Sequence, residues 1–140
     1  MTDHKPLEAF KAPTQLKLTA LWAATMFCYV YGDYFALYRP GRMEAMNKGM
    51  MGPLGEATPT VLVAVSALMI VPSLMVALSL VLKPVVGRWL NVAVGLAYTG
   101  IVCLTMKNAQ PYYLLFGTVD AALTLAVVWT ALRWPRTAAP

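Results

Sequence analysis

Two aspartates inside otherwise apolar segments are the residues of this sequence best suited to chemistry. Asp33 lies near the end of the apolar stretch 16–38, and Asp120 lies eight residues after the start of the stretch 112–134. A carboxylate at the centre of a bilayer costs roughly 2.5–3.5 kcal/mol on insertion scales, and less near the interface. Both side chains should therefore face the protein interior or water, where they can bind a cation, a small ligand or protons.

The residues around these aspartates are polar. Tyr29 precedes Asp33 by one helical turn, Tyr34 follows it directly, and Thr124 lies one turn after Asp120. Residues four apart share a helical face, so we predict a ligand-binding pocket built from these five side chains. The alternative is that each aspartate bonds to a hydroxyl or backbone group and only holds helices together. The sequence leaves both interpretations open.

Other kinds of chemistry find no support in the residue pattern. The single histidine, His4, lies in the polar N-terminal stretch, so we expect no metal site, no catalytic residues and no cofactor. Cys28 and Cys103 form no CxxC motif, and their depths in the predicted helices differ by roughly 10 Å, more than the roughly 7 Å that a disulfide allows. We expect both to be free thiols. Asn91 is expected to make an inter-helix hydrogen bond.

The composition indicates that lipid is the solvent of this chain. Of the 140 residues, 59% are hydrophobic and 12% are charged, whereas soluble domains carry roughly 25% charged residues. Four stretches approach the roughly 20 apolar residues that a membrane span requires: 16–38, 60–82, 89–106 and 112–134. Backbone groups in lipid must bond within their own segment. We therefore predict an all-α integral membrane four-helix bundle with up-down-up-down topology.

The connections between these stretches differ in length. Residues 83–88 and 107–111 are predicted to be tight turns, whereas residues 39–59 form a longer connection. Within it, Met43, Met46 and Met50 recur on one helical face, which predicts a short amphipathic helix on the membrane surface.

Pro72 lies near the middle of the second stretch and should kink that helix. One interpretation is a hinge, or a freed carbonyl that lines a cavity. The other is a tolerated kink that only packs against neighbouring helices.

The distribution of basic residues predicts the orientation. Seven Lys and Arg residues fall on the side of the two termini and four on the other side. This bias places residues 1–15 and 135–140 in the cytoplasm and the chain in the cell inner membrane, with the first apolar stretch retained as a signal anchor. The net charge of +5 is scattered and accompanies no nucleic-acid-binding motif, so the expected partner is the lipid bilayer and not a nucleic acid.

This orientation brings the two aspartates to similar depths. At a rise of 1.5 Å per residue, Asp33 and Asp120 lie roughly 7 and 12 Å below the outer boundary. Tyr38, Tyr112 and Tyr113 lie at the predicted outer ends of spans, where amphipathic rings favour the interface.

Three runs of the sequence carry a family resemblance: YGDYFALYRPG at 31–41, LSLVLKPVVGRWLN at 78–91 and VDAALTLAVVW at 119–129. Over residues 16–134 the chain resembles a family of small four-span bacterial membrane proteins of unknown function. The resemblance implies the fold and an acidic residue matching Asp120, and it implies no activity. Some relatives carry a further acid before the central proline, where this chain reads Ile70-Val71-Pro72.

Two other four-span families fit less well. Small multidrug exporters use a glutamate in the middle of the first span, where this chain reads LWAATMFCY. Quinone-linked disulfide formers require a CxxC motif.

Three functions remain in competition. The first is a non-enzymatic accessory or scaffold bundle, assembled as a homo-oligomer or with a membrane-protein partner through small residues spaced four apart. These pairs are Ala20 and Ala24, Ser73 and Ala77, Ala93 and Ala97, and Gly117 and Ala121. They let helices approach closely, so we expect them to support tight packing within the bundle, and they do not by themselves indicate a dimer face. The second is a small-molecule or proton-coupled carrier that uses Asp33 and Asp120. The third is a membrane enzyme acting on a lipid or quinone. Convergence of the two aspartates on a cavity open to the outside would favour the carrier, whereas aspartates each packed and satisfied by one neighbouring helix would favour the scaffold.

Overall fold

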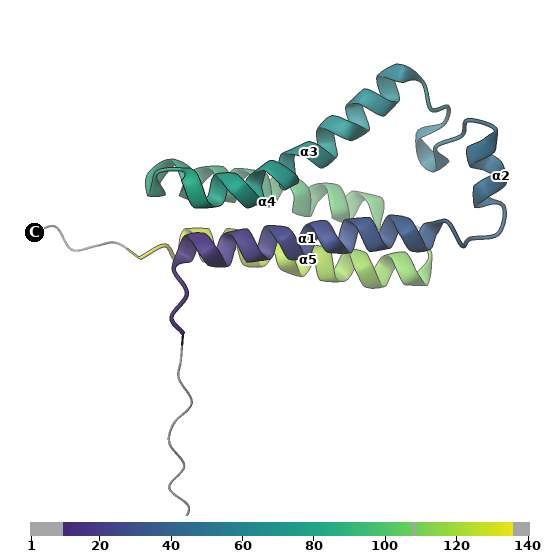
Figure 1. The fold of residues 1–140 in the computed structure, drawn as a ribbon. Helices are drawn as coiled ribbons and strands as arrows, with labels where there is room; N and C mark the ends of the chain where they lie inside the picture. Colours follow the sequence, from purple (N-terminus) through teal and green to yellow (C-terminus); the bar gives the residue numbers. More distant parts are fainter. Residues whose placement is uncertain (1–9, 108, 136–140) are drawn as a thin grey trace, which may run out of the picture.

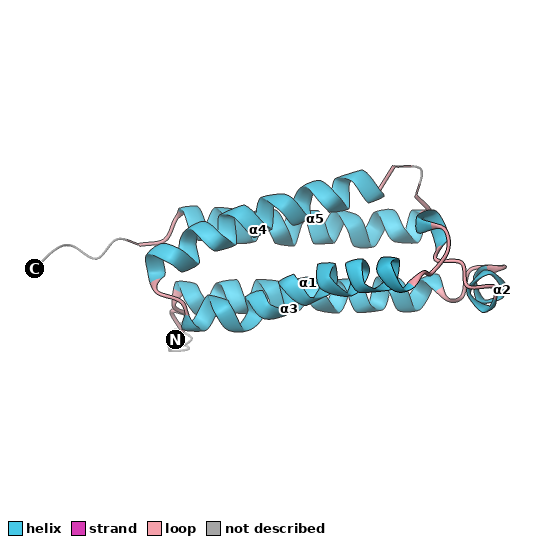
Figure 2. Ribbon diagram, turned by 90° about the horizontal axis from the view of Figure 1, so that it is seen from above, coloured by secondary structure: helices cyan, strands magenta, loops and turns pink. Residues whose placement is uncertain are grey.

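The computed structural model describes residues 10–107 and 109–135, and this part of the chain is all-α, as predicted. The elements are α1 (Thr14–Ala36), α2 (Arg42–Asn47), the short 3₁₀ helix η1 (Gly52–Leu54), α3 (Pro59–Val81), α4 (Pro84–Thr105) and α5 (Pro111–Leu132). The four long helices lie alongside one another, with α2 at one end and the first residues of α1 at the other (Figures 1 and 2). The six-residue helix α2 lies within the predicted amphipathic segment and carries Met43 and Met46.

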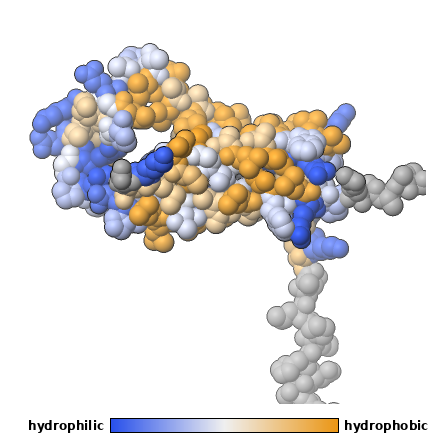
Figure 3. Space-filling view, turned by 180° about the vertical axis from the view of Figure 1, so that it is seen from behind, coloured by the Kyte–Doolittle hydropathy of each residue, from blue (hydrophilic) through white to orange (hydrophobic). Residues whose placement is uncertain are grey.

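Three of these helices, α3, α4 and α5, are long and apolar enough to cross a membrane. Helix α1 has the same length as α3, 23 residues, but it is less apolar and contains Lys17 and Asp33. Hydrophobic residues cover much of the surface of the long helices, and hydrophilic residues gather at the two ends (Figure 3). Many large apolar side chains are exposed, among them Leu62, Leu104 and Leu115. Such a surface matches a lipid solvent.

Prolines set the starts of three long helices. Pro59, Pro84 and Pro111 occupy first-turn positions, where the missing N–H costs no hydrogen bond and the fixed φ suits the helix. The expected turn at 83–88 is therefore wrong, because the helix already begins at Pro84. Gly87 lies inside that helix and is buried, with Leu82 and Trp134 within 4 Å of the place a Cβ would occupy.

A hydrogen-bonded asparagine holds three helices together in the half of the molecule near the α3–α4 turn. Trp22 Nε1 of α1 and Ser79 Oγ of α3 donate to Asn91 Oδ1 at 2.7 and 3.1 Å, and Asn91 Nδ2 donates to the Gly87 carbonyl at 2.8 Å. The predicted inter-helix hydrogen bond of Asn91 is thus confirmed. Trp22 also belongs to the cluster of buried apolar side chains that forms the core, together with Leu18, Met75 and Val127.

Helices α4 and α5 approach each other closely at Gly95. A Cβ there would lie 2.8 Å from Val128 Cγ2 and 3.3 Å from the Thr124 carbonyl oxygen. The expectation that Ala93 and Ala97 mediate close packing within the chain is wrong, since both are exposed. They lie on the opposite side of α4, because two residues along a helix correspond to about 200° of rotation.

Helix α3 packs over only part of its length. Its buried residues are Pro72, Met75 and Ser79, and none precedes Pro72. Figure 1 shows α3 bending near its middle, so that its first half diverges from α1 and α4 toward α2. The bend follows from the proline, which cannot donate a backbone hydrogen bond and crowds the preceding turn.

Candidate functional site

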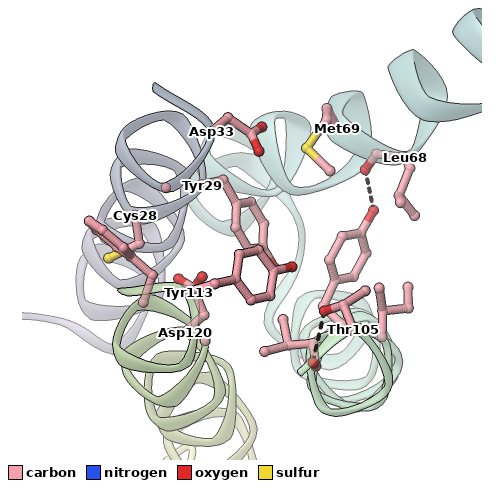
Figure 4. A pocket seen from close by; sticks show the side chains of 14 residues that line it. Cys28, Tyr29, Asp33, Leu68, Met69, Thr105, Tyr113 and Asp120 are labelled. Carbon is pink, nitrogen blue, oxygen red and sulfur yellow. Dashed lines mark hydrogen bonds between the residues drawn. The ribbon is translucent and has the colours of Figure 1, made fainter. Parts of the chain in front are cut away.

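A cavity of about 140 Å³ lies between α1, α3, α4 and α5, in the half of the molecule where α3 diverges. Its lining includes two carboxylates and four aromatic rings: Asp33, Asp120, Tyr29, Tyr98, Tyr113 and Phe116. In Figure 4, Asp120, Tyr29 and Tyr113 come from the α1–α5 side, and Leu68 and Met69 come from the α3 side. The two aspartates therefore converge on one cavity, because α1 and α5 run in opposite directions past each other.

Asp120 lies deep in this site. Only 4% of its surface is exposed, and its Oδ1 atom is buried without a hydrogen-bond partner among the described residues. The hydroxyl of Tyr29 is buried in the same way. Tyr29 also lies near enough to Asp120, Tyr98 and Tyr113 to interact with them electrostatically. A buried polar group without a partner costs about 1–3 kcal/mol, more if charged, so this arrangement is unfavourable for stability alone.

Asp33 lies at the rim of the same cavity. Unlike Asp120, it is exposed. The guanidinium of Arg42, the first residue of α2, lies close enough to act on it electrostatically. The cavity thus has one buried carboxylate and one accessible carboxylate.

Two of the five predicted pocket residues do not line the cavity. Tyr34 is exposed, and its hydroxyl lies 2.8 Å from that of Tyr38. One residue along a helix corresponds to about 100° of rotation, which turns Tyr34 away from the direction of Asp33. Thr124 is fully buried below the cavity, where its hydroxyl bonds to the Asp120 carbonyl at 2.9 Å and to Thr99 Oγ1 at 2.7 Å. It therefore joins α4 to α5.

Three aromatic lining residues were not predicted to belong to the pocket. Tyr113 was expected only at a membrane interface, and Phe116 and Tyr98 were not singled out. Tyr98 had a signal in the sequence, because a hydroxyl in an apolar helix needs an acceptor. The acceptor is the Leu68 carbonyl of α3, to which the Tyr98 hydroxyl donates. Leu68 precedes Pro72 by four residues, so the proline leaves this carbonyl without its helical donor.

The chemistry of the lining favours positively charged ligands. Among the described residues no Lys, Arg or His lines the cavity, and no group of three His, Cys, Asp or Glu side chains is placed to hold a metal ion. Aromatic ring faces attract organic cations, and carboxylates add full charge. Cys28 also lines the cavity, Cys103 is exposed, and both are free thiols as predicted.

A family model matches residues 7–139, almost the entire chain, and its description assigns no activity. No curated protein and no solved structure matches the chain. The predicted resemblance to a family of unknown function is confirmed as far as the family is concerned, and the match assigns no activity. The chain belongs to the family of unknown function DUF6326.

Proposed function

We propose that this protein binds and carries a small organic cation in the cavity between α1, α3, α4 and α5. The observation that carries this proposal is the buried carboxylate of Asp120, which has an oxygen without a partner among the described residues and faces aromatic rings. The Cys28 thiol of α1 lies close enough to interact with this carboxylate, but the Oδ1 atom has no partner among the described residues. A bound cation supplies the missing partner.

We further propose that the chain crosses the membrane four times, with α1 as a span beside α3, α4 and α5. Helix α1 packs against α3 and α5, which themselves have the length and composition of spans, and it exposes large apolar side chains such as Phe27 and Val30. With α1 as the fourth span, the long helices form an up-down-up-down four-helix bundle. The excess of Lys and Arg on the side of the termini supports a cytoplasmic location for both, in a bacterial inner membrane.

The size and lining of the cavity favour an organic cation over a metal ion. Calcium and magnesium take about six or more oxygen ligands, and this cavity offers two carboxylates. A cavity of about 140 Å³ is close to the roughly 150 Å³ that holds benzene in an engineered protein. A quaternary ammonium group of similar size fits this space, with its methyl groups against the tyrosine rings.

The test compares two probes of the same shape that differ in charge: choline, and dimethylbutanol, in which carbon replaces the nitrogen. Binding is measured by calorimetry with the full chain in lipid nanodiscs. We expect choline to bind about tenfold or more tightly than dimethylbutanol, because only the cation pairs with Asp120. Equal affinities, or no binding of choline and tetramethylammonium, would contradict the proposal.

A set of variants locates the binding in the cavity. Asp120→Asn should weaken choline binding by about tenfold or more, and Asp33→Asn should have a smaller effect because that carboxylate is exposed to solvent screening. Glu44→Gln is the matched control, since it removes the same charge from an exposed position in α2. It should leave choline binding unchanged.

The scaffold function is the second candidate, and one observation favours it. Two of the small-residue pairs, Ser73 with Ala77 and Ala93 with Ala97, are exposed on the outer surface, where another helix can approach closely. If Asp33→Asn and Asp120→Asn alter the oligomeric state in nanodiscs and choline does not bind the parent protein, the scaffold is the better description.

A further inference from the structure

Helices α3 and α4 face each other along a line that we call the seam. The two helices are joined near the α3–α4 turn and diverge toward α2. Two side-chain hydrogen bonds cross it within the described residues: Ser79 to Asn91, and Tyr98 to the Leu68 carbonyl. Beyond Leu68 no hydrogen bond joins the two helices in that part of the chain, and α3 buries no residue before Pro72. Helices α3 and α4 contact each other little. By contrast, α1 packs extensively on α3 and α5, and α5 packs extensively on α4.

The boundary between the closed and the open part of the seam depends on Pro72. Because proline has no N–H, the Leu68 carbonyl lacks the donor that a regular helix would supply. Tyr98 of α4 provides that donor from across the seam. The bond therefore holds α3 against α4 at the point where α3 bends away, and it sets how far the seam opens (Figure 1).

The open part of the seam leads into the cavity. Leu68 and Met69 of α3 and Ile101 and Thr105 of α4 line the cavity on either side of it. Three of these side chains are apolar, and both helices have the composition of membrane spans. Figure 3 shows a hollow in the surface beside the diverging part of α3. The cavity thus combines a charged interior at Asp120 with an apolar side that faces the surrounding lipid.

We propose that the cavity opens sideways into the bilayer through this seam, and that its ligands are amphiphiles with a quaternary ammonium head and a single hydrocarbon tail. The head occupies the cavity beside Asp120, and the tail passes between α3 and α4 into the hydrocarbon. Tyr98 is a positioning residue that fixes the width of the opening. This inference rests on the proposed function and names the ligand class of the same site.

The experiment measures the affinity of a series of alkyltrimethylammonium probes with lengthening tails for the full chain in nanodiscs. Concentrations are expressed per lipid, with protein-free nanodiscs as reference, so that partition into the bilayer is not counted as binding. A closed cavity of about 140 Å³ cannot hold a tail of more than about four carbons. With a lateral opening, we expect dodecyltrimethylammonium to bind at least as tightly as choline.

A bulky residue at the seam provides the second arm. Ile101→Trp should lower the affinity for dodecyltrimethylammonium about tenfold more than the affinity for choline, because the indole fills the path of the tail. Leu104→Trp, an exposed position on the same helix outside the cavity, is the matched control and should change neither affinity.

The outcomes separate this inference from the proposed function. If choline binds but affinity disappears as the tail lengthens, or if Ile101→Trp weakens both probes equally, the lateral opening is wrong and the cation site stands. If no ammonium probe binds, the cation site is wrong and the lateral opening falls with it.

Discussion

The two halves of the molecule differ at their most deeply buried polar side chains. In the closed half, around Asn91, the indole of Trp22, the hydroxyl of Ser79 and both ends of the Asn91 amide are hydrogen-bonded. Arg88 Nε is buried there without a partner among the described residues, but the same guanidinium donates to the Leu132 carbonyl through Nη2. In the open half, around the cavity, an oxygen of Asp120 and the hydroxyl of Tyr29 are buried with no partner among the described residues.

The difference indicates that the closed half stabilises the fold and that the open half binds the ligand. Satisfied networks make a core rigid, whereas an unpaired buried group lowers stability and persists where function requires it. We therefore expect substitutions in the closed half to lower the free energy of unfolding, and substitutions of Asp120 to affect binding.

The largest effect on stability should come from the centre of the closed half. Asn91→Ala leaves the buried donors of Trp22 and Ser79 without an acceptor and should lower the free energy of unfolding by about 3 kcal/mol. Denaturation in mixed detergent micelles measures this change. Asn47→Ala, at an exposed position in α2, is the control. A loss from Asn91→Ala no greater than that of the control would remove the distinction between the halves.

The next largest loss of stability should come from the close contact of α4 with α5. In Gly95→Ala the new Cβ would meet Val128 Cγ2 at 2.8 Å, so we expect a loss of about 2 kcal/mol from forced separation of the helices. Gly100→Ala is the matched control on the same helix, because nothing lies within 4 Å of its Cβ. That variant should be stabilising by up to about 1 kcal/mol through helix propensity. Similar losses from both variants would show that the contact at Gly95 is not tight.

A smaller loss of stability should result from a substitution at the boundary between the two halves. Tyr98→Phe removes the donor to the Leu68 carbonyl and should lower the free energy of unfolding by about 1–2 kcal/mol. In a Pro72→Ala background the helix supplies an N–H to that carbonyl, so the same substitution should cost less. A double-mutant cycle measures this coupling. Independent, additive effects would contradict the role assigned to Pro72.

Local sequence signals account for much of this architecture. Long apolar stretches predicted α3, α4 and α5 because lipid leaves the backbone no alternative to internal hydrogen bonding. Residue counts along antiparallel helices placed Asp33 and Asp120 in the same half, which is why both reach one cavity.

Features that depend on helix rotation and on contacts between distant segments were not predicted. The direction of Tyr34, the exposure of Ala93 and the burial of Thr124 depend on which face each helix presents, and a nearly uniform apolar sequence encodes that only weakly. The pairing of Tyr98 with the Leu68 carbonyl joins positions 30 residues apart, and no local pattern specifies it.

The central claim is that the Asp120 carboxylate, whose Oδ1 atom has no partner among the described residues, serves binding and not stability, and Asp120→Asn tests it most directly. The free energy of unfolding and the affinity for choline are measured on the same preparation of this variant and of the parent protein. We expect the free energy of unfolding to stay the same or rise by about 1 kcal/mol, since a buried charge is removed, while choline affinity falls about tenfold or more. A fall in stability with choline affinity unchanged would contradict the account.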